Sequence, residues 1–599
     1  MEGKGGRAKL IMIGGYPKVI RSVGPEYGLP PFEEIIHIPG GFDRFGVMEQ
    51  PLDLEAVVRE AEGWIHAVDA VAVVEHNGVA NPANEQQLKK LLEARYDVPV
   101  VCGHELFQEY NVLGRAASAL LNAKLIPVIR RFLDAIRTAL EARSVHADTV
   151  IVRSDGSLMG AEFARSRPVE TILCGPAASV LGGVFLTGEK DALLIDMGGT
   201  TTDIAVVRDG VPAAAASGVQ IGAWRTFVKS VQIDTIGLGG DSIVTRNKQG
   251  ELTIGPRRAM PLSYAATRWP KLRTELEALA QKEQFSTRPL NEYLTLSHDV
   301  SEDPSYSEEE RALSALLREE GPLQVDQAAT CLGIDIYRFN CDRLEQDGAV
   351  LRAALTMTDL MHLRGDFTEF DAETARAGAA FLACCLKVSV EELTALCYEK
   401  VRFALYRQCL LLLLRLYQPE LFGEGAGEQL EGIIRESWRQ HRLGKEDFFR
   451  FGFQTKALCV GLGAPTHIFL PEVAEALGTT AALPEHAAVA NAVGAIVGSV
   501  AAACTVEIKP VYGSGGIEGY NVLGGEVRNF ETIEEAQAFA EQRARTGAEQ
   551  EARKRGVTGS LRVGVKSHED RIGLGPSGEE GFEVFLGMTV TATAAGELG

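Results

Sequence analysis

An aspartate and two glycines at the end of an apolar run are the first candidates for chemistry in this sequence. The stretch ALLIDMGGTTTDIAVVRDG, residues 192–210, places Asp196, Gly198 and Gly199 between two apolar segments. Backbone N–H groups can approach a phosphate closely where no side chain blocks them, and the two glycines offer such groups. The spacing predicts a hairpin of strands 192–199 and 202–210 with a phosphate cradle at its turn.

Polar side chains around this turn suit the binding of phosphate and Mg²⁺. Asp196 ends the first strand, where its carboxylate is positioned to hold a hydrated Mg²⁺ ion or to orient an attacking water. Thr200, Thr201 and Thr202 add hydroxyl donors, and Asp203 could support the same polar network. The alternative interpretation is a tight hairpin whose threonines satisfy β-propensity.

Two further glycine clusters favour the phosphate interpretation. DTIGLGGDS, residues 234–242, contains Gly237, Gly239, Gly240, Asp241 and Ser242. GLGAPTH, residues 461–467, lies at the start of a predicted helix and contains Gly461, Gly463, Ala464 and Pro465. Glycine-rich turns and helix N-termini permit close packing against the phosphates or the adenosine of a nucleotide.

The order of these motifs carries a family resemblance. DMGGTTTD, RSDGSLMGAEFARSRPVETILCGPAASVLGG (153–183), DTIGLGGDS and GLGAPTH together resemble the A-type subunit of the hydantoinase/oxoprolinase family, a branch of the actin-like and sugar-kinase-like ATPase superfamily. The similarity extends to NPANEQ (81–86), GHELFQEYN (103–111) and LLNAKLIPV (120–128). VEIKPVYGSGGIEGY (506–520) and FLGMTVTATAAG (585–596) resemble the C-terminal domain of that family.

The resemblance implies an α/β protein with a two-lobed, actin-like (ribonuclease H-like) ATPase fold and an ATP site between the lobes. Asp196 to Asp203 would form the second phosphate hairpin, residues 461–465 the adenosine-side loop, and residues 237–242 a further nucleotide-facing turn. The implied reaction uses ATP and Mg²⁺ to phosphorylate the carbonyl oxygen of a cyclic amide (hydantoin, oxoproline or lactam) or a related carbonyl compound. A B-type hydantoinase subunit is the implied partner, and an oligomer is expected.

The beginning of the chain departs from the family pattern. Members of the family ordinarily begin with another DxGGT hairpin followed by a Thr- and Asn-rich segment, whereas this chain opens with MEGKGGRAKLIMIGG, which resembles sequence that follows both. We therefore expect an N-terminally truncated first lobe. The alternative function is a non-catalytic or degenerate nucleotide-binding scaffold of the same fold.

Alternating strand-like and helix-like segments indicate several domains in the 599 residues. Strands are predicted at 8–15, 70–77 and 98–103, and helices at 52–67, 84–95 and 108–144. The predicted domains are a truncated N-terminal lobe (1–145), a second lobe with the phosphate hairpin (146–255), an acidic, helical, winged-helix-like insert (256–375), the continued second lobe (376–505) and a small α+β domain (506–599).

Charge and composition argue against several classes of partner. The net charge is −21, and residues 307–347 of the insert contain ten Asp or Glu against four Arg and no Lys, which disfavours a winged-helix DNA regulator. The uncharged segment 487–504 is rich in Ala, Val and Gly, and is predicted to be a tightly packed internal helix rather than a membrane span. With ten scattered cysteines and no signal-peptide core, a cytoplasmic protein without nucleic-acid or membrane partners is expected.

Several other candidate residues have two possible interpretations each. His104 and Glu105 could line a substrate cleft or form a buried structural pair. Asp359, His362 and Asp366 have spacing compatible with a metal site, although a solvated helix end is favoured. Hydrogen-bonded turn residues are the first interpretation of Ser154, Asp155 and Ser157, with a substrate-facing loop as the alternative, and the adjacent Cys384 and Cys385 are interpreted as core residues.

Overall fold

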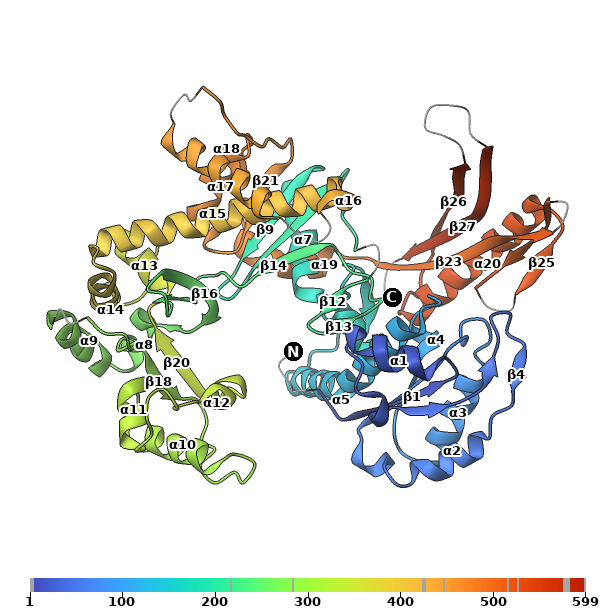
Figure 1. Ribbon diagram of the computed structural model, residues 1–599, viewed down its shortest axis with the longest axis horizontal. Coiled ribbons are helices and arrows are strands. Elements are labelled where there is room, and N and C mark those ends of the chain that lie inside the picture. The colour runs from blue at the N-terminus through green and yellow to red at the C-terminus, as the bar shows by residue number, and fades with distance from the viewer. Residues whose placement is uncertain are drawn as a thin grey trace. The chain divides into compact units, whose positions relative to one another are not determined.

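The computed structural model divides the chain into two compact units (Figure 1). Unit 1 contains residues 1–181, 214–231 and 491–599, and unit 2 contains residues 182–213 and 232–490. The structure describes residues 5–596 except 216–217, 283–284, 423–426, 445–447, 514–515, 525–526 and 575–581. Each unit is described by itself below.

Unit 1 begins with a four-stranded parallel sheet of order β2-β1-β5-β6. The helices and strands of its first segment are β1 (Ala8–Ile13), α1 (Pro17–Val23), β2 (Ile36–Ile38), β3 (Gly41–Phe42), β4 (Met48–Gln50), α2 (Leu54–Ala61), β5 (Ala70–Glu75), α3 (Ala83–Arg95), β6 (Val100–Cys102), α4 (Gly103–Leu106), α5 (Val112–Ala142), β7 (Val150–Val152), β8 (Leu158–Gly160) and α6 (Ala161–Ser166). Helix α7 (Cys174–Thr187) leads from unit 1 into unit 2.

The alternation of side chains along β1 explains why this sheet is covered on both faces. Leu10 and Met12 point into a core that also contains residues of α5, whereas Ile11 and Ile13 point into a second core with residues of α2 and α3. All six residues of β5 are buried, as is typical of strands in parallel sheets. The three strands predicted at 8–15, 70–77 and 98–103 are therefore present as β1, β5 and β6, with β6 at one edge of the sheet.

The C-terminal segment of unit 1 is an antiparallel sheet of order β25-β24-β23-β27-β26. Its elements, with the short pair that precedes them in the chain, are β12 (Gln220–Ile221), β13 (Trp224–Arg225), α19 (Ala490–Val497), β23 (Val500–Gly513), β24 (Gly516–Val522), β25 (Arg528–Phe530), α20 (Ile533–Lys554), β26 (Arg562–Leu574) and β27 (Phe582–Gly596). Helix α20 packs on this sheet through a row of fully buried alanines, Ala536, Ala540, Ala544, Ala548 and Ala552. The row recurs every fourth residue, so it forms one face of the helix.

The prediction of one tightly packed internal helix over residues 487–504 is wrong, because its first half is a partly exposed helix, in which Ile496 is 82% exposed, and its second half is a strand. Helix α19 ends at Val497, and β23 begins at Val500, where it pairs with Gly596 of β27. Alanine and valine fit either structure, and the pairing partner lies almost a hundred residues away in the chain. Among the described residues, α5 is the one helix long and apolar enough to cross a membrane, and 67% of its most apolar window is buried inside the protein.

Unit 2 is built around a mixed sheet in which β9 pairs antiparallel with β10 and parallel with β21. The elements before its long helices are β9 (Ala192–Met197), β10 (Thr202–Arg208), β11 (Val211–Pro212), β14 (Ile233–Ile236), β15 (Ser242–Arg246), β16 (Leu252–Arg258), β17 (Met260–Pro261), α8 (Leu262–Arg268), α9 (Lys271–Gln281), β18 (Tyr293–Leu296), α10 (Glu308–Glu320), β19 (Leu323–Gln324), α11 (Val325–Cys331), α12 (Asp342–Gln346) and β20 (Val350–Ala354). The hairpin predicted for residues 192–210 is present as β9 and β10.

The remaining helices of unit 2 enclose its largest hydrophobic core. They are α13 (Met357–Arg364), α14 (Ala372–Leu386), α15 (Val390–Tyr417), α16 (Pro419–Phe422), α17 (Glu428–Leu443) and α18 (Thr466–Ala476), with strands β21 (Leu458–Leu462) and β22 (Ala481–Ala482) in the mixed sheet. Helix α15 begins at a capping box in which Ser389 and Glu392 satisfy each other's backbone N–H groups. Helices α10 to α12 and strands β18 to β20 have a small hydrophobic core of their own, which includes Leu313, Leu317 and Leu344.

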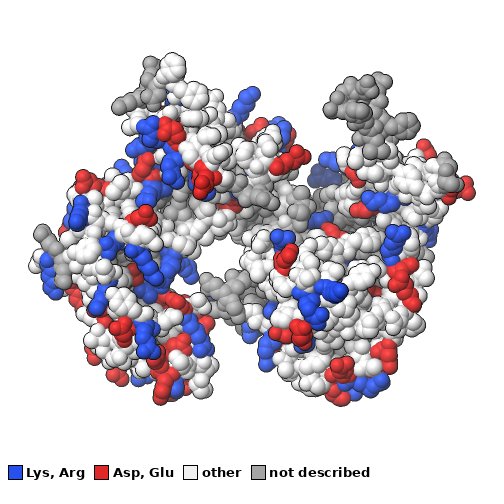
Figure 2. Space-filling view, in the orientation of Figure 1, with Lys and Arg blue, Asp and Glu red and all other residues white. Residues whose placement is uncertain are grey.

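Charged side chains of both signs cover both units. On the face shown in Figure 2, Lys and Arg are interspersed with Asp and Glu, although the chain as a whole carries a net charge of −21. Cys385, expected to be a core residue, is buried in α14, and Cys384 beside it is partly exposed.

Glu75, the last residue of β5, is a buried carboxyl group at the carboxyl end of the parallel sheet. Its Oε1 accepts hydrogen bonds from the backbone N–H of Phe42 (2.9 Å) and from Asn84 Nδ2 (3.1 Å). Its Oε2 is buried and has no hydrogen-bond partner within the part of the chain that the structure describes. Burial raises the pKa of Glu75 from 4.5 to about 7.

Replacement of Glu75 by glutamine should stabilise the protein at about pH 8 and leave its stability almost unchanged at about pH 4. The folded state holds an extra proton between the unfolded pKa of 4.5 and the folded pKa of about 7. The stability that this group contributes is therefore fully present below the unfolded pKa and is lost as the pH rises through the folded pKa, by at most about 3 kcal/mol. Thermal unfolding of both proteins across this pH range measures the effect, and a difference in unfolding temperature that does not change with pH would contradict it.

Candidate functional site

The hairpin of β9 and β10 brings Asp196 and Asp203 directly opposite each other. In the register of this antiparallel pair, Asp196 faces Asp203 and Met197 faces Thr202. The turn between the strands is closed by a hydrogen bond from the N–H of Gly198 to the carbonyl oxygen of Thr201 (3.0 Å). Gly198 and Gly199 are exposed at this turn.

The turn at residues 237–242 packs backbone against backbone on the hairpin. The N–H of Gly240 donates to the carbonyl oxygen of Gly198 (3.1 Å), and the N–H of Asp241 donates to that of Gly199 (2.6 Å). A Cβ atom on Gly239 would lie only 2.5 Å from the carbonyl carbon and oxygen of Gly199. Only glycine fits at position 239 without displacing the hairpin turn.

Two side chains of these turns are used internally. Ser242 is buried, and its Oγ accepts a hydrogen bond from the N–H of Gly239 (2.9 Å). Thr202 is also buried, and its hydroxyl donates to the carbonyl oxygen of Leu238 (2.7 Å). Gly237 lies beside Pro256, whose Cβ would be 2.8 Å from an added Cβ. Ser242, Thr202 and Gly237 therefore shape the turns rather than offer groups to a ligand.

The loop of residues 461–465 approaches Asp196 from the other side of β9. Strand β21 runs parallel to β9, with Leu462 opposite Asp196. Gly463 has a φ of +79°, and a Cβ atom there would lie 2.2 Å from the carbonyl oxygen of Met197 and 3.0 Å from Asp196 Oδ1. Gly463 thus meets two requirements of glycine at once, a left-handed backbone and a close approach.

The end of this loop starts helix α18. Pro465 is buried at the N-cap, Ala464 before it is exposed, and the hydroxyl of Thr466 donates to the carbonyl oxygen of Gly463 (2.8 Å). Gly461 is buried against Leu483, whose Cδ2 would be 2.6 Å from an added Cβ. All three glycine motifs therefore meet around the end of β9.

The two hairpin carboxylates differ in their surroundings. Asp203 Oδ1 accepts a hydrogen bond from the hydroxyl of Thr235 on β14 (2.5 Å). Burial and the neighbouring charge of Asp196 raise the pKa of Asp203, which the Thr235 hydroxyl opposes. Within the described residues, the carboxylate of Asp196 has neither a hydrogen bond nor an ion pair. It is therefore the hairpin carboxylate that remains available to a cation.

These groups fit a nucleotide phosphate with a hydrated Mg²⁺ ion. Glycines 198 and 199 leave backbone N–H groups open to a phosphate, and Asp196 offers the oxygen ligand that Mg²⁺ prefers. Arg258 adds positive charge, since its Nη1 lies 3.5 Å from the hydroxyl of Thr200. Burial raises the pKa of Asp241, and the nearby Arg258 guanidinium lowers it.

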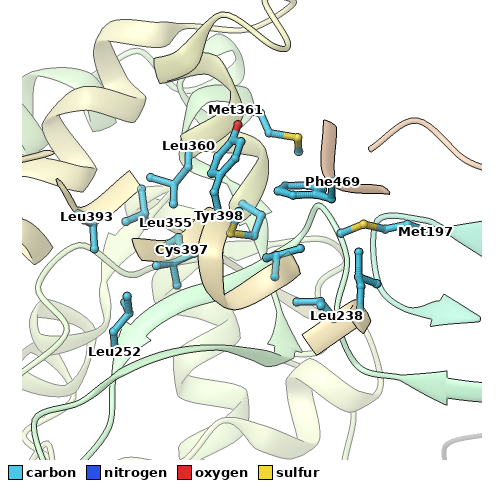
Figure 3. Close-up of a cluster of buried hydrophobic side chains, with 14 of the residues drawn as sticks. Met197, Leu238, Leu252, Leu355, Leu360, Met361, Leu393, Cys397, Tyr398 and Phe469 are labelled. Carbon is cyan, nitrogen blue, oxygen red and sulfur yellow. The ribbon is translucent and has the colours of Figure 1, made fainter. Parts of the chain in front are cut away.

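The hydrophobic core of unit 2 holds these turns from behind (Figure 3). Met197 directly precedes Gly198, Leu238 directly precedes Gly239, and both side chains are buried in the cluster that also contains Phe469 of α18. Each glycine motif is thus tied to the same core by a neighbouring apolar residue. Backbone groups of the turns remain at the surface because the side chains beside them are anchored inside.

Three further residues of this site were missed by the sequence analysis. Thr358 is buried, and both its N–H (2.8 Å) and its hydroxyl (2.9 Å) donate to the carbonyl oxygen of Gly240. Thr235 and Arg258 contact the hairpin as described above. Position 235 lies inside the DTIGLGGDS motif, so its signal was present, whereas Thr358 lies more than a hundred residues further along the chain and carries no local signal.

Asp359 and His362 form neither a metal site nor a solvated helix end, whereas Asp366 is exposed just beyond the end of α13. Asp359 is fully buried, and its carboxylate accepts hydrogen bonds from the N–H groups of Leu262 (3.1 Å) and Ser263 (2.8 Å). The Nδ1 of His362 contacts the carbonyl oxygen of Thr358 (2.8 Å), and its Nε2 accepts the N–H of Phe370 (3.0 Å). Asp359 caps helix α8, and both ring nitrogens of His362 are in use, so neither of these two side chains is available to solvent or to a metal. The spacing along one helix could not show that α8 packs against it.

Other candidates lie in unit 1. Ser154, Asp155 and Ser157 form a hydrogen-bonded turn, in which Asp155 Oδ1 accepts from the N–H (3.0 Å) and the hydroxyl (2.6 Å) of Ser157. His104 pairs with Glu85, and Glu105 forms an ion pair with Lys89 (2.9 Å). Both His104 and Glu105 also line a cavity.

Comparison with known proteins finds a caprolactamase subunit, a carboxylase subunit and a 5-oxoprolinase among the relatives of this chain. The caprolactamase subunit alpha of Pseudomonas jessenii is 32% identical over 215 residues, which cover 35% of this chain and 31% of that protein. The acetophenone carboxylase gamma subunit of Aromatoleum aromaticum is 25% identical over 236 residues, covering 38% and 32%. The 5-oxoprolinase of Saccharomyces cerevisiae is 34% identical over 155 residues, covering 24% and 11%. The matched region thus spans about a third or less of the length of these relatives.

Solved structures share the fold along almost the whole chain. The ATP-dependent caprolactamase of Pseudomonas jessenii matches with a TM-score of 0.59 at 17% identity, covering 99% of this chain and 76% of that chain. A nucleotide-free acetone carboxylase matches with a TM-score of 0.57 at 14% identity, covering 99% and 77%. The fold is therefore the mixed α/β fold of these proteins.

Two family models match successive parts of the sequence. One, for the hydantoinase/oxoprolinase N-terminal region, matches residues 1–96, and the other, for hydantoinase/oxoprolinase, matches residues 115–266 and so includes the β9–β10 hairpin. These two regions, which together cover less than half of the chain, therefore match the hydantoinase/oxoprolinase family.

Proposed function

We propose that the chain is the A-type, ATP-using subunit of a hydantoinase/oxoprolinase-like enzyme. In this proposal the backbone N–H groups of Gly198 and Gly199 contact the phosphates of ATP, and the Asp196 carboxylate holds Mg²⁺. The observation that carries it is the convergence of three glycine turns on the one hairpin carboxylate that has no partner within the described residues. The proposal includes the two-lobed fold of an actin-like ATPase, in which the nucleotide binds between the lobes.

The proposed reaction activates a carbonyl group. The carbonyl oxygen of a cyclic amide or a related compound attacks the terminal phosphorus of ATP, the bond from that phosphorus to the bridging oxygen breaks, and ADP leaves. Bound Mg²⁺ would neutralise the negative charge that develops on the phosphate oxygens. Asp196 would position the cation, while the glycine N–H groups and Arg258 would fix the phosphates in line with the attacking oxygen.

The relatives support this class of reaction and a partner subunit. Two of the relatives are named as enzyme subunits, and the names caprolactamase and 5-oxoprolinase denote action on cyclic amides. A B-type hydantoinase subunit that hydrolyses the activated amide is therefore the partner we propose. A nucleotide-binding scaffold without catalysis is the alternative.

The proposal predicts phosphate release that depends on a cyclic amide. The protein, alone and with a co-expressed B-type subunit, is incubated with MgATP and with candidate lactams, hydantoins or oxoproline, while phosphate is measured. Calorimetric titration with ATP is run in parallel. Phosphate release stimulated by one class of amide supports the enzyme, ATP binding without release favours the scaffold, and an absence of nucleotide binding rejects both.

Asp196→Asn should lower the rate of phosphate release by about two orders of magnitude or more without unfolding the protein. The substitution removes the negative charge that would hold Mg²⁺ but retains the size of the side chain. Asp209→Asn is the matched control, because Asp209 is an exposed aspartate at the opposite end of the same hairpin. An Asp196→Asn protein as active as the control would remove Asp196 from the mechanism.

Gly239→Ala should weaken ATP binding and destabilise unit 2 by about 1–3 kcal/mol, since the new Cβ would overlap the backbone of Gly199 at 2.5 Å. Gly432→Ala is the control for an added methyl group in unit 2, because Gly432 is exposed on α17, outside the three glycine motifs, and no atom lies within 4 Å of its added Cβ. Calorimetric titration and thermal unfolding measure the two effects. Equal unfolding temperatures for both variants would show that the turn does not depend on the contact between Gly239 and Gly199.

A further inference from the structure

Unit 1 contains a cavity of about 500 Å³ whose walls come from several parts of the chain that lie far apart in the sequence. The loop after β5, the segment His104 to Glu109, and the region of Arg153 and Arg167 form part of the lining. Lys229 and residues of β23 and α20 complete it. The residues of this cavity all belong to unit 1, whereas the phosphate hairpin belongs to unit 2.

His104 stands on the cavity wall and is held by a buried carboxylate. Its Nδ1 lies 2.6 Å from Glu85 Oε2, and its backbone N–H donates to the same oxygen (3.0 Å). Glu85 Oε1 accepts the N–H of Glu75 (2.7 Å), and the Glu85 side chain is fully buried. Glu85 is thus fixed by backbone groups on both of its oxygens, and the imidazole is fixed by Glu85.

This arrangement determines which nitrogen of His104 can act as a base. An ionised carboxylate only accepts hydrogen bonds, so the Nδ1 that faces Glu85 carries a proton. The neutral ring then has its lone pair on Nε2. The side-chain amide nitrogen of Gln86, which can only donate, lies 3.4 Å from this Nε2. The pair therefore has the geometry of a histidine base oriented by a carboxylate.

The cavity lining contains four arginine or lysine side chains and four glutamates, and one of these glutamates, Glu109, has a buried Oε2 without a hydrogen-bond partner among the described residues. Arg153 donates to Glu170 (2.7 Å), and Glu551 of α20 receives both Arg167 (3.1 Å) and Arg555 (3.2 Å). These charges neutralise one another in a linked network. Lys229 is exposed and makes no hydrogen bond or ion pair with any residue that the structure describes.

We propose that this cavity binds a small molecule that carries an anionic group and an N–H or O–H group, with Lys229 as the cation and His104 as the hydrogen-bond acceptor. The His104 Nε2 accepts a hydrogen bond from the N–H or O–H of the ligand, in place of the one from Gln86, while Nδ1–H donates to Glu85. His104 would be a binding residue of this site, and Glu85 a positioning residue. The site does not depend on nucleotide chemistry in unit 2.

A pair of ring compounds tests the requirement for an anionic group. 5-Oxoproline carries a carboxylate and an amide N–H, whereas 2-pyrrolidone has the same ring and N–H without the carboxylate. Calorimetric titration of the full chain should show binding of 5-oxoproline and binding of 2-pyrrolidone that is at least about tenfold weaker, equivalent to the loss of about 1.4 kcal/mol. Equal affinities, or binding of neither compound, would overturn the proposal.

Lys229→Met should weaken the binding of 5-oxoproline by about tenfold or more, since it removes only the charge of an exposed side chain. Lys90→Met is the matched control, because Lys90 is exposed on α3 and does not line the cavity. Asp196→Asn should bind 5-oxoproline as the wild type does. Loss of binding in Asp196→Asn with retention in Lys229→Met would place the ligand in unit 2 and overturn the assignment of the cavity.

Diethyl pyrocarbonate tests the role of His104, because it acylates a neutral imidazole nitrogen. Mass spectrometry of the peptide that contains residue 104 should show modification in the wild type, protection by 5-oxoproline, and slower modification in Glu85→Gln, in which the orienting charge is lost. Circular dichroism checks that Glu85→Gln is folded. If this variant is unfolded, the binding test with Lys229→Met, whose side chain is exposed, still decides the proposal. Modification of His104 at the same rate with and without saturating 5-oxoproline would contradict the proposal.

A metal ion is the competing occupant of the same residues. Glu85, Cys102 and His104 each place a potential ligand atom within 4.8 Å of the others. In the structure the Cys102 thiol instead donates to the carbonyl oxygen of Glu85 (3.4 Å), and burial raises the pKa of this thiol. Addition of Co²⁺ should therefore produce no thiolate-to-metal absorption band. A band that disappears in Cys102→Ser would identify a metal site and overturn the assignment of His104 as a hydrogen-bond acceptor.

Discussion

The close contact between two glycine turns determines the geometry of unit 2. The N–H groups of Gly240 and Asp241 hydrogen-bond to the carbonyl groups of the β9–β10 turn, and Gly239 touches Gly199 without room for a side chain. Because backbone atoms have fewer degrees of freedom than side chains, such a contact fixes the turn more precisely than a side-chain contact would. The exposed N–H groups beside Asp196 keep their positions for this reason.

The sequence predicted the parts of this arrangement but not their contacts. Apolar runs that end in glycine identified β9, β10 and the turns at 237–242 and 461–465, since each motif is local. The partners of Gly240 and Asp203 include Thr358 and Thr235, and only the fold brings Thr358 to the turn. Motifs therefore indicated the residue types needed at the site, whereas the residues that support them required the tertiary structure.

Errors in the sequence analysis arose where one local pattern fits two structures. Residues 500–504 are apolar and small, and their pairing with the last strand of the chain decides in favour of a strand. Asp359 and His362 have the spacing of metal ligands, but Asp359 accepts the N–H groups that begin helix α8, an element almost a hundred residues earlier. The Glu85–His104 pair was missed for the same reason, because its two members lie on different elements.

Helix α20 shows how packing sets the size of a binding site. Its alanine row brings the helix axis close to the C-terminal sheet. The same helix places two charged residues in the cavity wall, Glu551 just before Ala552 and Arg555 at the C-terminal end of the helix. The methyl groups of Ala548 and Ala552 thus act as spacers that define how far these two charged side chains reach. A bulkier residue in the row would lift the helix and change the volume of the cavity without altering any residue that lines it.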